Sequence, residues 1–297
     1  MKYIFHQVDV FTDSPFGGNP LAVFTESKGL TNEIMQKISK EMNLSETAFV
    51  FPSANLLADY SIRIYTPEKE LPFAGHPTLG TAHILRETGK VPGGSYIIKL
   101  AMAAGIINVA SKDLGNFLYM KHPLPEIRLP LKCANEISEA LGIPISDINY
   151  SYCPIQIIST GLPVLIVPIT SLDAIKNITV EPNKLKKLLV ALGTEMVYTF
   201  TQQTINANAS IHSRAFAPGL GIGEDPATGS AAGAIAAYLY KHKLLPEQMQ
   251  NSIYIEQGFE IGRPSSIHVK IEQKANELKS ILVGGESVTV IKGWLNI

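Results

Sequence analysis

Cysteine is scarce in this sequence: Cys133 and Cys153 are the only two among 297 residues. Neither lies in a spacing typical of a metal site, and the pattern does not support the disulfide framework of a small secreted protein. The histidines show no metal-ligand spacing either. The glycines of Gly219–Gly223 lack the strand and following acid that a dinucleotide fingerprint requires. The residue patterns therefore favour no metal, disulfide or nucleotide site.

The sequence also lacks a long uncharged apolar run and an excess of either charge. No such run approaches membrane-spanning length, and 25 Lys and Arg stand against 26 Asp and Glu without a basic block. Nucleic acid and anionic membranes are therefore not expected as partners. The first residues alternate apolar and polar side chains and include Asp9 and Asp13, which predicts a strand and not a signal peptide. We expect a soluble cytoplasmic protein.

The sequence does contain an internal repeat. His76-Pro-Thr-Leu-Gly-Thr-Ala matches Asp225-Pro-Ala-Thr-Gly-Ser-Ala, and 225 minus 76 is 149. Two upstream segments match in the same order, and they pair residues 48–51 with 197–200 and residues 63–67 with 214–218. Three matches at nearly one offset predict two halves built alike. We expect domains at 1–121 and 122–284, with a last strand at about 285–297 that returns to the first domain.

Hydrophobic periodicity and turn signals predict many strands and few helices. Expected strands cover 2–11, 20–25, 46–52, 59–66, three segments within 95–121, and 153–159, 163–169, 195–202, 209–216, 252–256, 266–272, 278–283 and 287–292. Expected helices cover 31–42, capped by Thr31, and 77–88, closed by Gly89, then 133–141 and 181–191. This pattern predicts an α+β protein of two similar β-rich domains, each a curved sheet wrapped round a central helix, with a pseudo-twofold relation between them.

The central helix of the second half is predicted from its ends. Asp225 is a favoured N-cap residue, Pro226 suits the first helical position, and Lys241 suits the last turn. No charged residue occurs from Gly229 to Tyr240, so this helix must be covered on all sides. Its first amide groups form a suitable seat for a carboxylate or phosphate.

Three ionisable side chains are candidates for chemistry. His76 and Asp225 occupy matching positions before the two central helices, where the positive helix end favours neutral histidine. The plain alternatives are that His76 ends a turn and Asp225 caps a helix. Glu46 begins an otherwise apolar strand, and its alternative is an exposed strand-end carboxylate. Asn19, Ser45 and Ser230 could bind a ligand or serve as turn and cap residues, and Arg263 could hold a carboxylate or lie in solvent.

Five segments together resemble the phenazine-biosynthesis isomerase (PhzF-like) family. They are VDVFTDSPFGGNPLAVF (8–24), LSETAFVF (44–51), LPFAGHPTLGTA (71–82), GEDPATGSAAG (223–233) and QGFEIGRPS (257–265). The resemblance covers nearly the whole chain. It implies a diaminopimelate-epimerase-like fold with the active site between the domains, frequent homodimers, and neither cofactor nor metal.

By position, the resemblance assigns the family's catalytic glutamate to Glu46, its partner histidine to His76, and its aspartate and serine to Asp225 and Ser230. It places Gly75 and Gly229 where backbone amides meet the substrate. In the phenazine enzyme, the glutamate takes a proton from a ring carbon of dihydro-3-hydroxyanthranilate and returns it elsewhere on the same face.

Three functions follow as hypotheses. The first is a cofactor-independent isomerase in which Glu46 moves a proton on a small cyclic or unsaturated carboxylate. The second is an epimerase that uses His76 and Asp225 on opposite faces of the substrate. The third is a non-catalytic module that binds a small anion. Thiol-based epimerases and racemases of the fold that the resemblance implies carry a cysteine at each of the two helix starts. This chain has His76 and Asp225 there, so inversion by two thiols is excluded.

Overall fold

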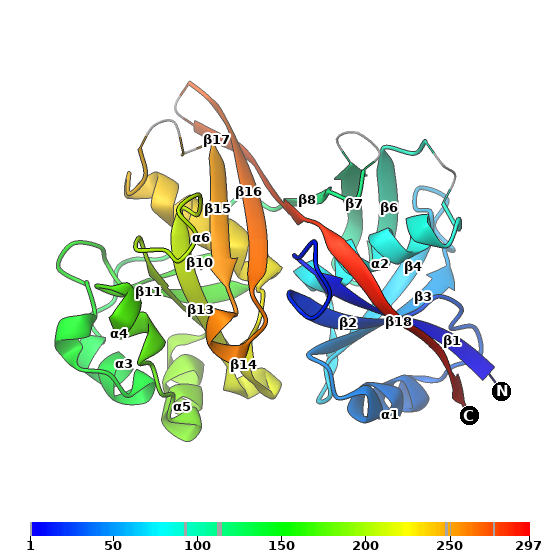
Figure 1. Cartoon of the computed structure of the whole chain (residues 1–297), viewed down its shortest axis with the longest axis horizontal. Helices are drawn as coiled ribbons and strands as arrows, with labels where there is room; N and C mark the ends of the chain where they lie inside the picture. Colours follow the sequence, from blue (N-terminus) through cyan, green and yellow to red (C-terminus); the bar gives the residue numbers. More distant parts are fainter. Residues whose placement is uncertain (1, 92–93, 112–114, 247–248, 250, 276) are drawn as a thin grey trace. The chain divides into compact units, whose positions relative to one another are not determined.

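The structure is a computed structural model that describes residues 2–91, 94–111, 115–246, 249, 251–275 and 277–297. The chain forms two compact units (Figure 1). Unit 1 comprises Met1–Lys121 and Gly284–Ile297, and unit 2 comprises His122–Val283. Among the described residues, no helix is both long enough and apolar enough to cross a bilayer.

Unit 1 is built on a sheet in which the strands follow the order β18-β1-β2-β3-β4-β6-β7-β8. The pairs β2–β3 and β4–β6 are parallel, the other pairs are antiparallel, and short β5 pairs with β4. The strands are β1 (Lys2–Val10), β2 (Asn19–Phe24), β3 (Glu46–Pro52), β4 (Tyr60–Tyr65), β5 (Glu70–Leu71), β6 (Ile97–Met102), β7 (Gly105–Ser111), β8 (Leu118–His122) and β18 (Ser287–Asn296), and the helices are α1 (Asn32–Met42) and α2 (Gly75–Glu87).

Unit 2 has a sheet with the order β9-β10-β11-β12-β13-β15-β16, and β14 pairs with β13. Its strands are β9 (Glu126–Ile127), β10 (Gln156–Ser159), β11 (Pro163–Pro168), β12 (Val197–Thr201), β13 (Ile211–Ala217), β14 (Ile222–Asp225), β15 (Ser252–Gln257) and β16 (Ser265–Lys274), followed by β17 (Glu277–Gly285). Its helices are α3 (Ala134–Leu141), α4 (Leu172–Lys176), α5 (Pro182–Leu192) and α6 (Gly229–Lys241), with short 3-10 turns at Ile145–Asp147, Pro218–Leu220 and Phe259–Ile261.

The two units repeat one series of strand pairings. In both, an antiparallel pair (β1–β2, β10–β11) is followed by a parallel pair (β2–β3, β11–β12) and another antiparallel pair (β3–β4, β12–β13). A short antiparallel strand (β5, β14) and the central helix then lead to a second parallel pair (β4–β6, β13–β15). The predicted fold class, with two similar halves round central helices, is therefore confirmed.

The sheet of unit 1 has a different helix on each face. Alternating side chains place Ala22 and Phe24 in a cluster with Met35 and Ile38 of α1. Leu21 of β2 and Val10 of β1 face α2 instead, and a Cβ on Gly80 would lie only 2.8 Å from a side-chain atom of each. Glycine at position 80 therefore allows α2 to lie close against the sheet.

The sheet of unit 2 is covered in the same way. One face packs on α3, α4 and α5, and its cluster contains Ile137, Leu185, Val197 and further buried residues. The other face holds α6, where the rings of Tyr238 and Phe200 meet edge to face with centroids 5.6 Å apart. Nearly every residue of α6 is buried, as the absence of charge predicted.

The start of the second central helix is where the prediction was wrong. Helix α6 begins at Gly229 with Thr228 as its N-cap, so Asp225 is not the cap and Pro226 is not the first helical residue. Asp225 instead ends strand β14 and pairs with Ala215 of β13. The tertiary contacts of Asp225 keep the backbone extended beyond the point where local sequence favours a helix.

The other boundaries differ by smaller amounts. Helix α2 begins at Gly75, two residues earlier than predicted, so His76 lies inside its first turn and not before it. Strand β10 begins at Gln156, so Cys153 lies outside it. Thr31 caps α1 as predicted, because its side chain accepts a hydrogen bond from the amide of Ile34. Part of the predicted β-rich stretch at 95–121, residues 112–114, lies outside the described residues.

Candidate active site

Glu46 is a buried carboxylate at the start of strand β3. Its side chain is turned to the α2 face of the sheet. Phe49, three residues further along β3, packs on the α1 face, and residues an odd number apart in a strand point to opposite faces. Glu46 also pairs in parallel register with Leu21, which faces α2. The residue is only 7% exposed, so the alternative of a solvated strand-end glutamate does not hold.

His76 lies beside Glu46 in the first turn of α2. Its Nε2 atom is 3.4 Å from Oε2 of Glu46, and the residue is 4% exposed. Burial lowers the pKa of His76 to about 3, so the contact joins a carboxyl group to a neutral imidazole and is not an ion pair. The buried Nε2 atom has no hydrogen bond within the described protein. Such an atom marks a place where a ligand could bond.

The other predicted residues of unit 1 lie close to this pair in the chain or in the sheet. Gly75 is the first residue of α2 and directly precedes His76. Ser45 directly precedes β3 and is half-buried. Asn19 begins β2 and is fully buried, two residues before the Leu21 that pairs with Glu46. Unit 1 therefore brings Asn19, Ser45, Glu46, Gly75 and His76 to one end of neighbouring strands and to the first turn of α2.

Asp225 is the predicted ionisable group of unit 2, and its surroundings are polar and buried. The hydroxyl of Thr228 donates to Oδ2 of Asp225 at 2.6 Å, and Asp225 is 5% exposed. The side-chain amide of Gln257 donates to the backbone carbonyl of Asp225 at 2.7 Å. The aspartate is therefore held by both its carboxylate and its backbone.

Gly229 and Ser230 form the first turn of α6, where a helix leaves backbone amides without helical partners. Gly229 is buried and Ser230 is half-buried. Arg263 is also half-buried, and its backbone amide donates to the carbonyl of Gly258. A role for Arg263 in holding a carboxylate stays a prediction.

The sequence predicted a free backbone amide at Thr228 as part of the anion seat, but this amide donates to Oε1 of Gln257 at 3.2 Å. Sequence reasoning did not single out the Thr228 hydroxyl, Gln257 or Tyr198. The hydroxyl of Tyr198 donates to Oε1 of Gln257 at 3.1 Å. The same Oε1 accepts from the backbone amide of Thr228, and Nε2 of Gln257 donates to the Thr228 hydroxyl. A signal for Thr228 was its place between Asp225 and the glycine that begins the helix. No comparable local signal marks Gln257, because its partners lie 29 to 59 residues away.

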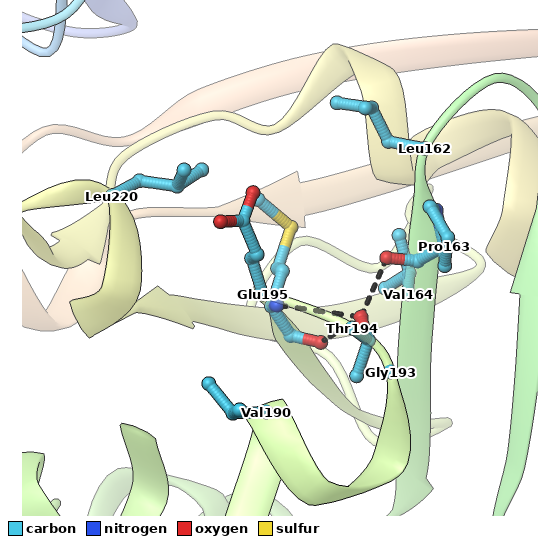
Figure 2. A pocket seen from close by; sticks show the side chains of 9 residues that line it. Leu162, Pro163, Val164, Val190, Gly193, Thr194, Glu195 and Leu220 are labelled. Carbon is cyan, nitrogen blue, oxygen red and sulfur yellow. Dashed lines mark hydrogen bonds between the residues drawn. The ribbon is translucent and has the colours of Figure 1, made fainter. Parts of the chain in front are cut away.

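An apolar pocket of about 310 Å³ also lies in unit 2 (Figure 2). It contains none of the predicted site residues. Beside it, the hydroxyl of Thr194 donates to the carbonyl of Pro163 at 2.6 Å and so ties the end of α5 to β11. The lining residues are Leu162, Pro163, Val164, Val190, Gly193, Thr194, Glu195, Met196 and Leu220.

Within the part of the chain that the structure describes, no group of three or more His, Cys, Asp or Glu side chains is arranged to hold a metal ion. The expectation of a reaction without metal or cofactor stays a prediction.

Comparison with known proteins identifies relatives along the full length. A family model described as phenazine biosynthesis-like protein (PhzC-PhzF) matches residues 8–293. The trans-2,3-dihydro-3-hydroxyanthranilate isomerase of Pseudomonas fluorescens is 36% identical over 299 residues, which cover 97% of each chain. A solved PhzF-family structure from Bacillus anthracis has a TM-score of 0.90 and 26% identity, with complete coverage of both chains.

A more distant likeness supports the fold alone. A probable proline racemase from Agrobacterium radiobacter has a TM-score of 0.65 at 13% identity, covering 99% of this chain and 92% of that one. The epimerase-like fold expected from the motifs is therefore confirmed. With a family match over nearly all its residues and an isomerase among its relatives, the chain belongs to the PhzF family of isomerases.

Proposed function

We propose that this protein is a cofactor-independent isomerase that moves a proton on a small cyclic or unsaturated carboxylate, with Glu46 as the general acid and base. The observation that carries the proposal is the buried contact of 3.4 Å between Glu46 and His76 at the start of α2, in a chain of the PhzF family. A carboxyl group placed at a helix start within a family of isomerases is well suited to proton transfer.

In the proposed reaction, Glu46 removes a proton from a substrate carbon and returns it to another carbon. The neutral imidazole of His76 lets the adjacent carboxylate remain a base, because no positive charge on the ring neutralises it. Nε2 of His76, buried and without a hydrogen bond in the described protein, is available to bond the substrate. Positioned acid–base catalysis typically supplies about 10²- to 10⁴-fold.

Negative charge develops on the substrate when the proton leaves. Backbone amides at Gly75 in α2 and at Gly229 in α6 would stabilise that charge, as fixed dipoles do in oxyanion sites. We propose that Asp225 assists Glu46 in catalysis on the same substrate and that Ser230, Ser45 and Asn19 bind it. The buried carboxylate of Asp225 and the half-buried hydroxyl of Ser230 are suited to these roles.

The named relative supplies the first compound to test. The isomerase of Pseudomonas fluorescens acts, by its name, on trans-2,3-dihydro-3-hydroxyanthranilate, and the family match places this chain beside it. We propose a substrate of the same chemical class, a ring or unsaturated system that carries a carboxylate.

The test is an incubation of the protein in heavy water with a set of small carboxylates that includes this compound. We expect NMR to show deuterium entering one carbon of a converted substrate, because the proton that Glu46 takes from the substrate can exchange with solvent deuterium before Glu46 returns a proton to the other carbon. Deuterium accompanied by inversion at a single stereocentre would instead indicate an epimerase that uses His76 and Asp225. Carboxylates that bind but are neither converted nor labelled with deuterium would overturn the proposal in favour of an anion-binding module.

A further inference from the structure

Gln257 is a fully buried amide whose hydrogen-bonding capacity is completely used. Its Nε2 group donates to the carbonyl of Asp225 at 2.7 Å and to Oγ1 of Thr228 at 3.0 Å. Its Oε1 atom accepts from the amide of Thr228 at 3.2 Å and from the hydroxyl of Tyr198 at 3.1 Å. Two donor hydrogens and two acceptor sites are therefore matched, so the orientation of the amide is fixed.

This orientation determines the direction of the Thr228 hydroxyl. Because Oγ1 of Thr228 accepts from Gln257, its own hydrogen is directed to Oδ2 of Asp225, at 2.6 Å. Thr228 makes no side-chain capping bond in α6, although it is the N-cap residue. Its hydroxyl thus connects Gln257 to the Asp225 carboxylate.

The end of β15 that carries Gln257 is itself anchored. His212 lies between two carboxylates, with Nδ1 2.7 Å from Oε1 of Glu256 and Nε2 2.9 Å from Oε1 of Glu260. Burial opposes charge on the ring, but the hydrogen bonds to both glutamates outweigh it and raise the pKa of His212. Glu256 also accepts from the amides of Ile205 and Asn206. These bonds on both sides of position 257 hold its backbone in place.

The following residues contact the segment before α6 directly. Gly258 has a φ of +82°, and a Cβ there would lie 2.5 Å from the carbonyl oxygen of Pro226. The hydroxyl of Ser265 donates to the same carbonyl at 2.9 Å. The motif that begins at Gln257 therefore packs along Asp225–Thr228, the stretch that the sequence predicted to be helical.

We propose that Gln257 is a positioning residue for the reaction, which acts on the Asp225 carboxylate through the hydroxyl of Thr228. This inference rests on the proposed function, since it assigns Asp225 a part in catalysis. Gln257 keeps the segment extended and directs the Thr228 hydroxyl to Oδ2 of Asp225, which fixes the orientation of the carboxylate.

The first variant is Gln257→Glu, which keeps the size of the side chain and its acceptor oxygen but removes the two donor hydrogens. The Thr228 hydroxyl would then turn toward the new carboxylate and leave Asp225. We expect kcat for solvent-deuterium incorporation to fall about 10- to 100-fold while KM changes little, because the carboxylate is misplaced and not removed.

A matched control exists in the same unit. Gln156 is also a buried strand glutamine, whose Nε2 donates to the carbonyl of Arg128 and whose Oε1 bonds His242. His242 follows the other end of α6, which is about 20 Å from the first turn for a helix of this length. Gln156→Glu introduces the same buried charge, so it should lower the urea midpoint but leave kcat close to the wild-type value.

A second pair of variants tests the role of the Thr228 hydroxyl between Gln257 and Asp225. It gives a result even if Gln257→Glu does not fold. Thr228→Val removes the hydroxyl at nearly constant shape and should lower kcat about 10- to 100-fold. Thr228→Ser keeps the hydroxyl and should restore most of the rate. In the double variant with Gln257→Glu, the loss should be no greater than the larger single loss, because both changes remove the same hydrogen bond.

The outcomes separate this inference from the proposed function. Wild-type kcat in Thr228→Val, or a loss in Gln257→Glu no larger than in Gln156→Glu, would overturn the positioning role while the proposed function stands. Wild-type exchange in Glu46→Gln would overturn the proposed function and this inference with it. Equal losses in Thr228→Val and Thr228→Ser would mark a purely structural role and would also overturn it.

Discussion

Burial sets the chemistry of Glu46 and His76. A glutamate at a strand end is usually solvated, yet alternation along β3 turns Glu46 to the face that α2 covers. The same covering makes His76 neutral, since a buried imidazole loses more by charging than it gains from a contact of 3.4 Å. A neutral imidazole therefore lies beside the buried carboxyl group of Glu46 at neutral pH.

The lowered pKa of His76 predicts how the free energy of unfolding changes with pH. The unfolded chain takes up a proton on this histidine near pH 6.5, whereas the folded chain does so only near pH 3. Between these values His76 lowers the free energy of unfolding by about 1.4 kcal/mol for each pH unit of acidification. Urea unfolding of wild type and His76→Gln from pH 7 to pH 4.5 measures this, and the variant should show the shallower slope.

The other histidines remain in both proteins and cancel in the comparison. Equal slopes in the two proteins would show that His76 protonates in the folded state as readily as in the unfolded chain, which would contradict the neutral imidazole. The side chain should likewise show no NMR titration between pH 5 and pH 8.

At the residue scale, the sequence could predict which residues are candidates for the site, but it could not predict their burial or their contacts. The repeat and the motifs single out Glu46, His76 and Asp225, whereas the burial of Glu46 depends on α2, which is supplied by a segment about 30 residues later. Gln257 escaped notice for the same reason, because each of its partners comes from another element.

At the scale of the element, α6 shows how tertiary contacts override a local signal. Asp225-Pro226 has the composition of a helix start, but the bonds from Gln257 and the pairing with Ala215 keep this segment extended. The equivalent segment of unit 1 has no such side-chain clamp among the contacts described, and α2 begins at Gly75, before His76. The middle of each helix could be predicted from composition, and its first residue could not.

A second feature of the elements is a repeated arginine. Arg63 of β4 makes a two-pronged ion pair with Glu70 of β5, and Arg214 of β13 makes one with Glu224 of β14. Each guanidinium also lies over an aromatic ring two residues later in its strand. These two arginines begin the matching sequence segments 63–67 and 214–218, and they carry out the same structural task in both units.

The two arginines should nevertheless differ in importance. The Arg63 side chain is 31% exposed, whereas that of Arg214 is 8% exposed and also donates to the carbonyls of Ile175, Lys176 and Ile178. Arg214→Ala leaves three carbonyls and the Glu224 carboxylate, whose side chain is 11% exposed, without their partner, and should cost about 3–5 kcal/mol. Arg63→Ala should cost about 1 kcal/mol or less.

Urea unfolding of both variants at one pH measures the difference, and each serves as the control for the other. Similar losses in the two variants would contradict the account, since they would show that burial does not distinguish the two ion pairs.

At the scale of the whole molecule, the repeated pairing series shows one architecture used twice, with different residues, His76 and Asp225, at the matching sequence positions before a proline. The halves are therefore alike in fold and differ in these candidate site residues. The duplication could be predicted from the sequence, because short matching segments recur in the same order at a nearly constant spacing. The homodimer expected from the family resemblance stays a prediction, which a measurement of the molecular mass in solution would test.

The central claim is that Glu46 moves the proton, and Glu46→Gln tests it most directly, because the amide keeps the shape of the side chain but cannot act as a base. Deuterium incorporation into a converted carboxylate is measured by NMR in heavy water, beside wild type and the exposed control Glu33→Gln. The account predicts that Glu46→Gln folds normally and loses about 10²- to 10⁴-fold or more in rate, with Glu33→Gln unaffected. Exchange by folded Glu46→Gln at the wild-type rate would contradict it.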